Sequence, residues 1–225
     1  EKIEDTKNND ANNNYYSNKV TVDGLSENTT YYYQVKKDDK WGDIEEYQTK
    51  SFSDFSFLYV GDPQIGASSN KDNDAANWNK VLNQAVGNHD VSFMVSAGDQ
   101  INDTNGDSED EYYGYLGADA LRSLPVATTI GNHDSKNPNY SYHFNTPNNF
   151  NDAFKTYTNG RTSAGTDYYY TYGNVLFIVL DTNNYNCATH ENVIKKAISE
   201  NPDAKWRVVT FHQDIYGAAR NHSDS

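Results

Sequence analysis

Hydrophobic and polar positions follow two different patterns along the chain, and the change comes near Ser53. Before it, short segments rich in Tyr and β-branched residues alternate with turns, as antiparallel strands do. They predict strands at residues 20–22, 31–35 and 47–49, with Trp41 just before the last. The first 14 residues are polar and rich in Asn, and we expect the extreme end to be poorly ordered.

After Ser53, apolar strands alternate with amphipathic helices. Trp78, Leu82 and Val86, for example, recur at helical spacing. The pattern predicts helices at residues 75–86, 107–124, 150–157 and 191–200. It predicts strands at residues 55–60, 91–96, 126–130 and 206–211, and a hairpin at 168–181 that turns at Gly173-Asn174. Repeated strand–helix–strand units predict an α/β fold with a mixed sheet covered by helices.

The two patterns predict two units, residues 1–52 and residues 53–225. In the first unit, Tyr31 directly follows a turn, as the tyrosine corner of β-sandwich domains does. Roughly 50 residues make only half of such a domain. Residues 1–52 are therefore interpreted as part of an all-β domain.

The composition excludes several classes of function. The 225 residues have 36% hydrophobic and 14% aromatic side chains, and this aromatic content favours a packed core. A formal net charge of −14 disfavours long nucleic acids and anionic membrane surfaces, because both attract Lys and Arg. The longest apolar run, residues 175–180, is too short to span a bilayer, and no signal peptide opens the chain. The single cysteine, Cys187, excludes an internal disulfide and a thiolate zinc cluster.

Three predicted strands end in a Gly followed by a side chain that can bind a metal ion. These pairs are Gly61-Asp62, Gly98-Asp99 and Gly131-Asn132, and a fourth strand ends at His212. The carboxyl ends of such strands meet at one sheet edge, and each Gly permits a sharp turn and close approach. A single Gly-Asp is usually only a turn, and a lone His is usually a core residue, but recurrence favours a shared site. Carboxylate, amide oxygen and imidazole together suit Mn, Zn, Fe or Co.

These residues resemble the ordered motifs of the calcineurin-like metallophosphoesterases: Gly61-Asp62-x-Gln64, Gly98-Asp99, Gly131-Asn132-His133-Asp134 and Val209-Thr210-Phe211-His212. The resemblance runs from about Phe55 to the end, and Gly-Asn-His-Asp is its most specific part. The segment before it resembles the fibronectin-like N-terminal domain of purple acid phosphatases. The resemblance implies a four-layer α/β/β/α sandwich, incomplete at its C-terminus, after a partial fibronectin III-like domain.

The resemblance also implies a role for each matching residue. Asp62 would bind a first metal, Asp99 would bridge two metals, and Asn132 and His212 would bind the second. His133 would face the substrate phosphate and the leaving group, with Asp134 orienting its ring. The implied cofactors are two divalent transition metal ions (Mn, Fe or Zn), and a hydroxide that bridges them would hydrolyse a phosphomonoester or phosphodiester. Tyr216 is a further candidate for substrate binding, since it follows His212 closely.

The sequence departs from the family pattern at three places. Gln64 stands where the family commonly has His, which makes it a weaker ligand for the first metal. Asn102 stands where purple acid phosphatases carry a ligand Tyr, so we expect no ferric-tyrosinate site. The closing Gly-His-x-His motif is absent, because His222 does not match it, and we expect the chain to be a C-terminally truncated piece.

Two hypotheses remain open at this stage. The first is a phosphoesterase that acts on a small phosphorylated substrate, with an extracellular or cell-surface location implied by the resemblance. The second is a non-catalytic surface-binding module with a degenerate phosphoesterase domain, which the changes at Gln64 and Asn102 motivate. An acidic cluster after Asp99, from Asp103 to Glu111, is interpreted mainly as a solvated helix start, with substrate selection as the alternative.

Overall fold

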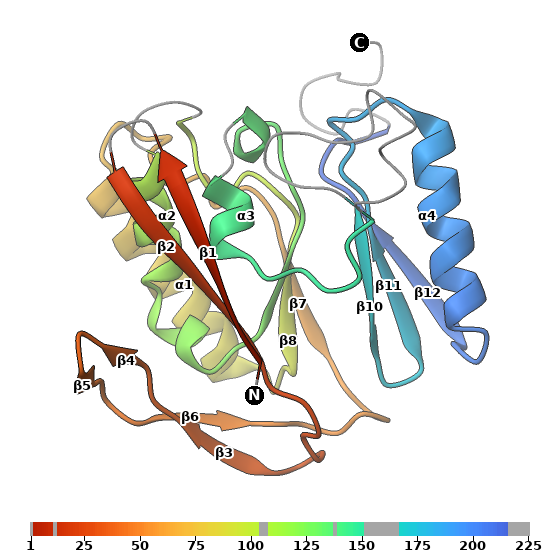
Figure 1. The fold of residues 1–225 in the computed structure, drawn as a ribbon, viewed down its shortest axis with the longest axis horizontal. Helices are drawn as coiled ribbons and strands as arrows, with labels where there is room; N and C mark the ends of the chain where they lie inside the picture. The colour runs from red at the N-terminus through yellow and green to blue at the C-terminus, as the bar shows by residue number, and fades with distance from the viewer. Residues whose placement is uncertain (1, 11–12, 104–107, 137–138, 151–166, 216–225) are drawn as a thin grey trace.

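The computed structural model describes residues 2–10, 13–103, 108–136, 139–150 and 167–215, and two three-stranded sheets face each other at its centre (Figure 1). The first sheet is parallel and has the order β7 (Phe57–Val60), β8 (Phe93–Ser96) and β9 (Val126–Thr128). In the second sheet, β10 (Tyr168–Tyr172) runs antiparallel to β11 (Val175–Val179), and β12 (Trp206–Thr210) runs parallel to β11. The predicted hairpin at 168–181 is thus confirmed.

An aromatic layer fills the space between the two sheets. The Phe93 ring lies 5.3 Å from the Phe57 ring, stacked on it, and 5.4 Å from the Phe177 ring, edge to face. Tyr170 stacks on Phe177 at 4.8 Å and meets Phe93 edge to face at 6.1 Å. Successive strand residues point to opposite faces, so Phe93 enters this layer while Met94 faces the helices. Each sheet is therefore apolar on both faces, as an inner layer must be.

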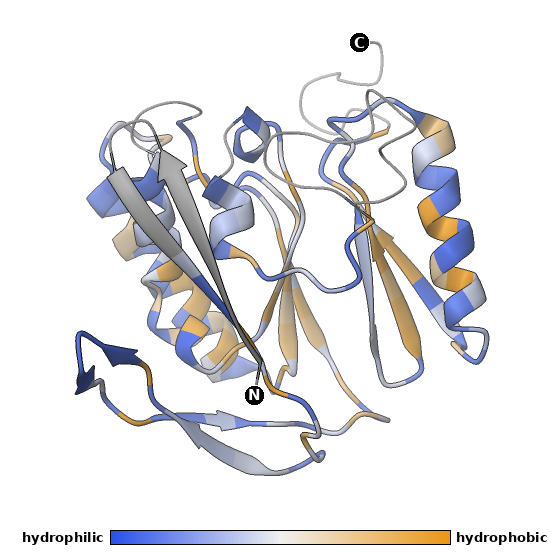
Figure 2. Cartoon of the chain, in the orientation of Figure 1, coloured by the Kyte–Doolittle hydropathy of each residue, from blue (hydrophilic) through white to orange (hydrophobic). Residues whose placement is uncertain are grey.

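Helices cover the outer face of each sheet, which completes an α/β/β/α arrangement. α1 (Lys71–Asn88) and α2 (Ser108–Leu116) cover the first sheet through Trp78, Leu82 and Tyr115. α4 (Cys187–Glu200) covers the second sheet through Val193 and Ala197. Figure 2 shows the apolar sides of these helices turned toward the strands. The predicted α/β class and its four layers are confirmed.

Two predicted helices have different boundaries in the structure, one because of a capping side chain and one because of a break. α4 begins at Cys187 rather than near residue 191, because the Asn186 side chain accepts hydrogen bonds from the first-turn N–H groups. The predicted helix 107–124 is wrong as one element: α2 ends at Leu116, and the short 3-10 helix η1 (Asp119–Arg122) follows. The break falls at Gly117, where a Cβ would lie only 2.8 Å from the Tyr113 carbonyl oxygen.

Short elements and the N-terminal strands complete the described chain. The helices are η2 (Asp134–Lys136) and α3 (Asn139–His143). The strands are β1 (Lys2–Asp10), β2 (Asn13–Thr21), β3 (Thr30–Tyr33), β4 (Lys36–Lys37), β5 (Lys40–Trp41) and β6 (Glu45–Gln48). Of the predicted helix 150–157, all but Phe150 lies outside the described residues. Among the described residues, no helix combines the length and apolarity that a bilayer crossing requires.

Residues 2–10 form a strand that the sequence pattern did not predict, and Glu1 lies outside the described residues. β1 pairs with β2 along its whole length, from Lys2 opposite Thr21 to Asp10 opposite Asn13. Strand pairing uses main-chain groups, so a polar, Asn-rich sequence does not prevent it. The hairpin is tied to the rest of the molecule where Ser17 Oγ donates to the Tyr142 carbonyl oxygen at 2.7 Å.

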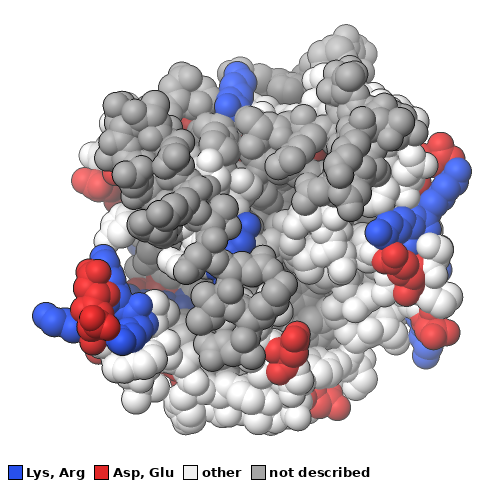
Figure 3. Space-filling view, viewed as in Figure 1, with Lys and Arg blue, Asp and Glu red and all other residues white. Residues whose placement is uncertain are grey.

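β3 and β6 form a two-stranded sheet that contacts the layered part of the fold through η1. The Tyr31 hydroxyl accepts a hydrogen bond from the Ser26 backbone N–H at 2.8 Å, which is the contact that defines a tyrosine corner. Tyr33 donates to the Arg122 carbonyl oxygen at 2.6 Å, and Arg122 pairs with Glu45 at 2.9 Å. On the face seen in Figure 3, charged side chains gather over the β4–β5 hairpin and along α4.

Candidate metal centre

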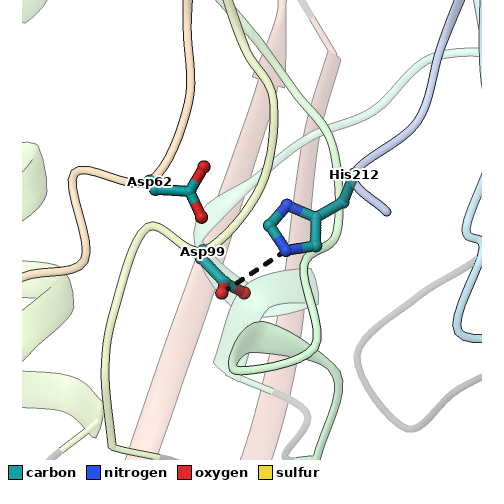
Figure 4. Close-up of side chains that lie close together, drawn as sticks. All are labelled: Asp62, Asp99 and His212. Atoms are coloured by element: carbon teal, nitrogen blue, oxygen red, sulfur yellow. Dashed lines mark ion pairs between the residues drawn. The ribbon is translucent and has the colours of Figure 1, made fainter. Parts of the chain in front are cut away.

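Four strand ends deliver polar side chains to one place. Asp62 follows β7, Asp99 follows β8, Asn132 follows β9, and His212 follows β12 of the other sheet. One ligand atom each of Asp62, Asp99 and His212 lies within 4.8 Å of the others. Figure 4 shows the two carboxylates and the imidazole directed toward a common point. The predicted convergence of distant strand ends is therefore present in the structure.

Both aspartates adopt a backbone conformation that is uncommon for residues other than glycine. Asp62 has φ +52° and Asp99 has φ +48°. The turns are held by main-chain bonds from Asp62 N to the Gly98 carbonyl oxygen, 3.2 Å, and from Gln64 N to the Asp99 carbonyl oxygen, 2.9 Å. Left-handed conformations at non-glycine residues are costly and concentrate at functional sites. The turns therefore fix where the carboxylates point.

Glycine is required at two of the three predicted positions. At Gly98, φ is +103° and a Cβ would overlap the His212 ring, and at Gly131 a Cβ would overlap the Asp99 carboxylate. At Gly61 the prediction of a required glycine is wrong, because a Cβ there would meet only Ala97 Cβ, at an ordinary 3.7 Å. Two glycines thus let the third and fourth strand ends approach Asp99.

The His212 ring is oriented for ligation by a main-chain acceptor. Its Nδ1 lies 2.9 Å from the Ala97 carbonyl oxygen, which can only accept, so Nδ1 carries a proton. Nε2 then faces Asp99 Oδ2 at 3.4 Å and Asn132 Oδ1 at 3.2 Å. Metal-binding histidines characteristically donate their second ring nitrogen in this way.

The electrostatics of the group favour a bound cation. Burial opposes charge on the His212 ring, but the hydrogen bond and charge of Asp99 outweigh it and raise the pKa of His212 to about 9. Burial also raises the pKa of Asp62, with His212 opposing and Asp99 reinforcing the shift. Both shifts reflect two carboxylates that lie close to each other and to the imidazole. This set of carboxylate, amide and imidazole donors fits a divalent transition metal ion.

Two further predicted ligands lie beside this group. Asn132 places Oδ1 near His212 Nε2, so its amide oxygen faces the same point as the carboxylates. Gln64 has φ +41° and is tied to Asp99 by its backbone N–H. Its side chain as a ligand remains a prediction. Tyr216 and His222 lie outside the described residues.

His133 is held at the edge of the metal group. Its backbone N–H donates to Asp99 Oδ1 at 2.9 Å, and its ring Nδ1 bonds the Asn102 carbonyl oxygen. Because a carbonyl only accepts, Nδ1 is the protonated nitrogen. Nε2 lies 4.0 Å from Asp99 Oδ2, and the side chain is 29% exposed. Nε2, the ring nitrogen that is not engaged by the Asn102 carbonyl, is therefore the one that lies beside Asp99.

The expectation that Asp134 orients His133 is not what the structure has. Asp134 is fully buried and accepts hydrogen bonds from the Gly131 N–H at 2.9 Å and the Tyr112 hydroxyl at 3.0 Å. Burial, reinforced by the nearby Asp99 charge, raises the pKa of Asp134 to about 7. The His133 ring finds its acceptor in the Asn102 carbonyl instead. Asp134 thus holds the turn at Gly131, and reaches His133 only through the backbone.

A pocket of about 510 Å³ opens beside His133. Its other lining residues are Gly66, Ser69, Lys71, Asn102, Asp103, Glu111 and Lys136. Of these, the sequence pointed only to Asn102, as a family ligand position, and to Asp103 and Glu111, through the alternative of substrate selection. Glu111 contradicts the interpretation of the acidic cluster as solvated, because it is only 4% exposed. Nothing in a single sequence distinguishes it from its exposed neighbours on α2, since burial here depends on tertiary contacts.

Comparison with known proteins agrees with this geometry. The sequence model of calcineurin-like phosphoesterases matches residues 55–225. The chain belongs to the calcineurin-like phosphoesterase family. All four strand-end residues and the pocket of this calcineurin-like phosphoesterase chain fall inside the matched segment.

Solved structures agree on the fold. A purple acid phosphatase isolated from yellow lupin (Lupinus luteus) seeds aligns with a TM-score of 0.56 and 14% sequence identity. The alignment covers 87% of this chain and 38% of the lupin chain, so this chain spans well under half of that protein's length. A search of curated proteins finds no match.

Proposed function

We propose that this protein hydrolyses phosphoesters of small molecules with the help of divalent metal ions. The observation that carries the proposal is the convergence of Asp62, Asp99 and His212 within 4.8 Å, with the His133 ring beside them at the mouth of a pocket. Family membership over residues 55–225 supports the same class of reaction. The net charge of −14 favours small substrates over long nucleic acids.

The residues divide into a metal-binding and a substrate-facing set. Asp62, Asp99, Asn132 and His212 would hold two metal ions, with Asp99 shared and Gln64 as an additional ligand. When bound, such ions supply Lewis-acid polarisation of the phosphoryl oxygens and of the attacking water. Mn, Fe and Zn suit this donor set.

His133 would serve the leaving group. Its Nδ1 is engaged by Asn102, so Nε2 is the nitrogen that can pass a proton to the oxygen leaving phosphorus. The pocket beside it has room for the alcohol part of the substrate. The pocket wall carries Lys71 and Lys136 as well as the carboxylates of Asp103 and Glu111, and Lys71 pairs with Asp110 at 2.8 Å. Lys136 is therefore the candidate cation for an anionic substrate.

Asp99→Asn tests the proposal, because it removes one charge from the metal group without changing size. We expect the wild-type protein to cleave 4-nitrophenyl phosphate or its bis-ester when Mn²⁺, Zn²⁺ or Fe²⁺ is added. Asp99→Asn should lower kcat by at least about 100-fold, a loss typical of removing a group that acts in the transition state. Asp203→Asn, the same change at an exposed turn after α4, should leave kcat unaltered.

Wild-type protein with no metal-dependent cleavage of either ester would contradict the proposal. It would favour the alternative of a binding module with a degenerate phosphoesterase domain. Equal activity of Asp99→Asn and wild type would contradict the assignment of the metal group.

Two broader proposals rest on resemblance. The Tyr31–Ser26 contact supports residues 1–52 as part of a fibronectin III-like domain, with residues 53–225 as the phosphoesterase domain. We also propose an extracellular or cell-surface location, by analogy with phosphatases that carry such a domain.

A further inference from the structure

Glu111 behaves differently from the acidic residues beside it on α2. Asp110 pairs with Lys71 on the surface, whereas Glu111 is 4% exposed. Glu111 Oε2 accepts hydrogen bonds from two consecutive backbone N–H groups, those of Asn102 at 2.8 Å and Asp103 at 2.6 Å. Burying a carboxylate is costly unless it is hydrogen-bonded, so these two bonds account for its tolerated position.

The chain also makes room for this carboxylate from the opposite side. Gly66 has φ +102°, and a Cβ at that position would overlap the carboxylate of Glu111. The turn at Gly66 is fixed separately, by a 3.0 Å hydrogen bond from its N–H to Asp74 Oδ2. The turn at Gly66 and the Asn102–Asp103 backbone, which are distant in sequence, thus both fit closely around the Glu111 carboxylate.

Asn102 connects this carboxylate to His133. The N–H of Asn102 donates to Glu111, and the carbonyl oxygen of the same residue accepts from His133 Nδ1. A displaced Asn102 backbone would release the ring from the acceptor that fixes its proton on Nδ1. Nε2 would then lose its fixed place beside Asp99 and the pocket.

We propose that Glu111 is a positioning residue for phosphoester hydrolysis: by holding the Asn102–Asp103 backbone, it fixes the orientation and tautomer of His133. The inference rests on the proposed function for its catalytic consequence. Its structural part, the tautomer of His133, does not depend on that function.

The step that Glu111 supports is protonation of the leaving group. As the P–O bond breaks, the leaving oxygen keeps the electron pair, and water supplies the new oxygen on phosphorus. The proton that this water loses passes to the leaving oxygen through Nε2 of His133, so the protons balance. The Nδ1 proton stays donated to the Asn102 carbonyl oxygen throughout. A misdirected ring matters most when the leaving oxygen is strongly basic.

Glu111→Leu and Glu111→Gln test this chain of contacts with two substrates. Leu removes both acceptor oxygens, whereas Gln keeps an oxygen that can accept from the same two N–H groups. With phenyl phosphate, whose leaving group is poor, we expect Glu111→Leu to lower kcat roughly 100-fold, since a misplacement of about 1 Å can cost that much. With 4-nitrophenyl phosphate the loss should be several-fold smaller, and Glu111→Gln should retain most activity on both.

A double-mutant cycle separates positioning from general damage. In a His133→Ala background, Glu111→Leu should lower kcat little further, because the ring through which it acts is gone. Glu109→Leu is the matched control: Glu109 lies on the same helix and bonds His143 at 3.1 Å, away from the pocket. Its effect should be independent of the leaving group.

The inference would be overturned if Glu111→Leu lowered kcat equally for both substrates. It would also be overturned if Glu111→Leu lowered kcat by the same factor in the His133→Ala background as in wild type. Inactive wild-type protein would instead contradict the proposed function. If Glu111→Leu does not fold, Glu111→Asp withdraws the carboxylate by one methylene and must show the same dependence on leaving group, in smaller measure.

Ring ¹⁵N NMR reads out the structural part without any turnover. In wild-type protein the His133 signal should show the proton on Nδ1, with His133→Ala providing the assignment. Glu111→Leu should give a mixture of tautomers, and Glu111→Gln should resemble wild type. An unchanged tautomer in Glu111→Leu would overturn the positioning role.

Discussion

Asp99 receives contacts from three directions through a carboxylate that is almost fully buried. The backbone N–H of His133 donates to one oxygen, and the other oxygen faces the Nε2 atoms of His212 and His133. Gly131 and Gly98 permit this crowding, because neither places a Cβ between the groups. At the scale of single residues, the site therefore depends on glycines, which leave room, as much as on the polar side chains that fill it.

The two kinds of glycine before the ligands should respond differently to Ala. Gly98→Ala forces a Cβ into a left-handed conformation, at about 1–2 kcal/mol, and pushes it against the His212 ring. We expect a lower metal content by elemental mass spectrometry and a lower melting temperature. Gly61→Ala is the control and should keep both values, since its Cβ would meet only Ala97. Similar losses in both variants would contradict the role given to Gly98.

The motif residues could be predicted from the sequence, whereas their supporting contacts could not. Asp62, Asp99, Asn132 and His212 each follow an apolar strand, and that placement alone indicates one sheet edge. Glu111 and the Asn102 carbonyl act through burial and main-chain geometry, which leave no mark on residue type. The role expected of Asp134 was wrong for the same reason: a main-chain acceptor serves His133 in its place.

At the scale of elements, α1 shows how one helix face anchors the first sheet. Leu82 is 1% exposed and packs in the cluster that α1 shares with α2 and the sheet, whereas its neighbour Val81 is 59% exposed. Leu82→Ala should lower the free energy of unfolding by about 2–5 kcal/mol, through lost burial and a remaining cavity. Val81→Ala, measured in the same urea titration, should change it by less than about 0.5 kcal/mol. Equal effects would contradict this packing.

α4 is tied to the start of β10 by a charged hydrogen bond. His190 Nδ1 lies 2.7 Å from Asp167 Oδ2, and Nε2 lies 2.8 Å from the Asn184 carbonyl oxygen. Burial lowers the pKa of His190, but Asp167, Asn184 and the more distant Asp181 charge outweigh it, so the net shift is upward. Since the folded pKa is raised, the stabilisation is complete below the unfolded value of about 6.5 and declines as pH rises through the folded pKa.

His190→Gln should therefore destabilise the protein more at pH 6 than at pH 9. A hydrogen bond to a charged group contributes about 1.5–3 kcal/mol, which sets the scale of the loss at pH 6. Urea unfolding at the two pH values measures it. His89→Gln, at the exposed end of α1, is the control. A larger loss at pH 9 than at pH 6 would contradict the direction of the shift.

Element boundaries were harder to predict than the elements themselves. Apolar spacing indicated α1 and α4, but Asn186 extends α4 and Gly117 divides the predicted helix 107–124. Caps and breaks depend on single side chains and on close backbone contacts, which periodicity does not record. The β1–β2 hairpin escaped prediction because main-chain pairing holds it, without an apolar pattern.

At the scale of the whole molecule, the site spans the boundary between the sheets. Asp62, Asp99 and Asn132 come from the first sheet, and His212 comes from the second. The alternation of strands and helices predicted a mixed sheet covered by helices, and the division into two facing sheets was implied only by the family resemblance. Neither could predict how the β3–β6 sheet sits against η1, because that placement rests on contacts such as Tyr33 with Arg122.

Because both sheets contribute ligands, metal binding should stabilise the whole fold. A ligand at 100 times its Kd adds about 2.7 kcal/mol to the free energy of unfolding, or several degrees in Tm for a chain of this size. Adding Mn²⁺ or Zn²⁺ should raise Tm, and a chelator should reverse the rise. His212→Ala should abolish most of the metal-induced rise in Tm. A full rise in that variant would place the metal elsewhere.

The aromatic layer between the sheets has a consequence for ion selectivity. Phe93 belongs to the strand that leads to Asp99, and Phe177 pairs in register with Val208 of the strand that leads to His212. Ring size in this layer therefore sets the separation of the two strand ends, and with it the separation of their donor atoms. We expect apolar substitutions in this layer, remote from Asp99 and His212, to change which ionic radius the proposed site prefers, while the motif residues themselves stay intact.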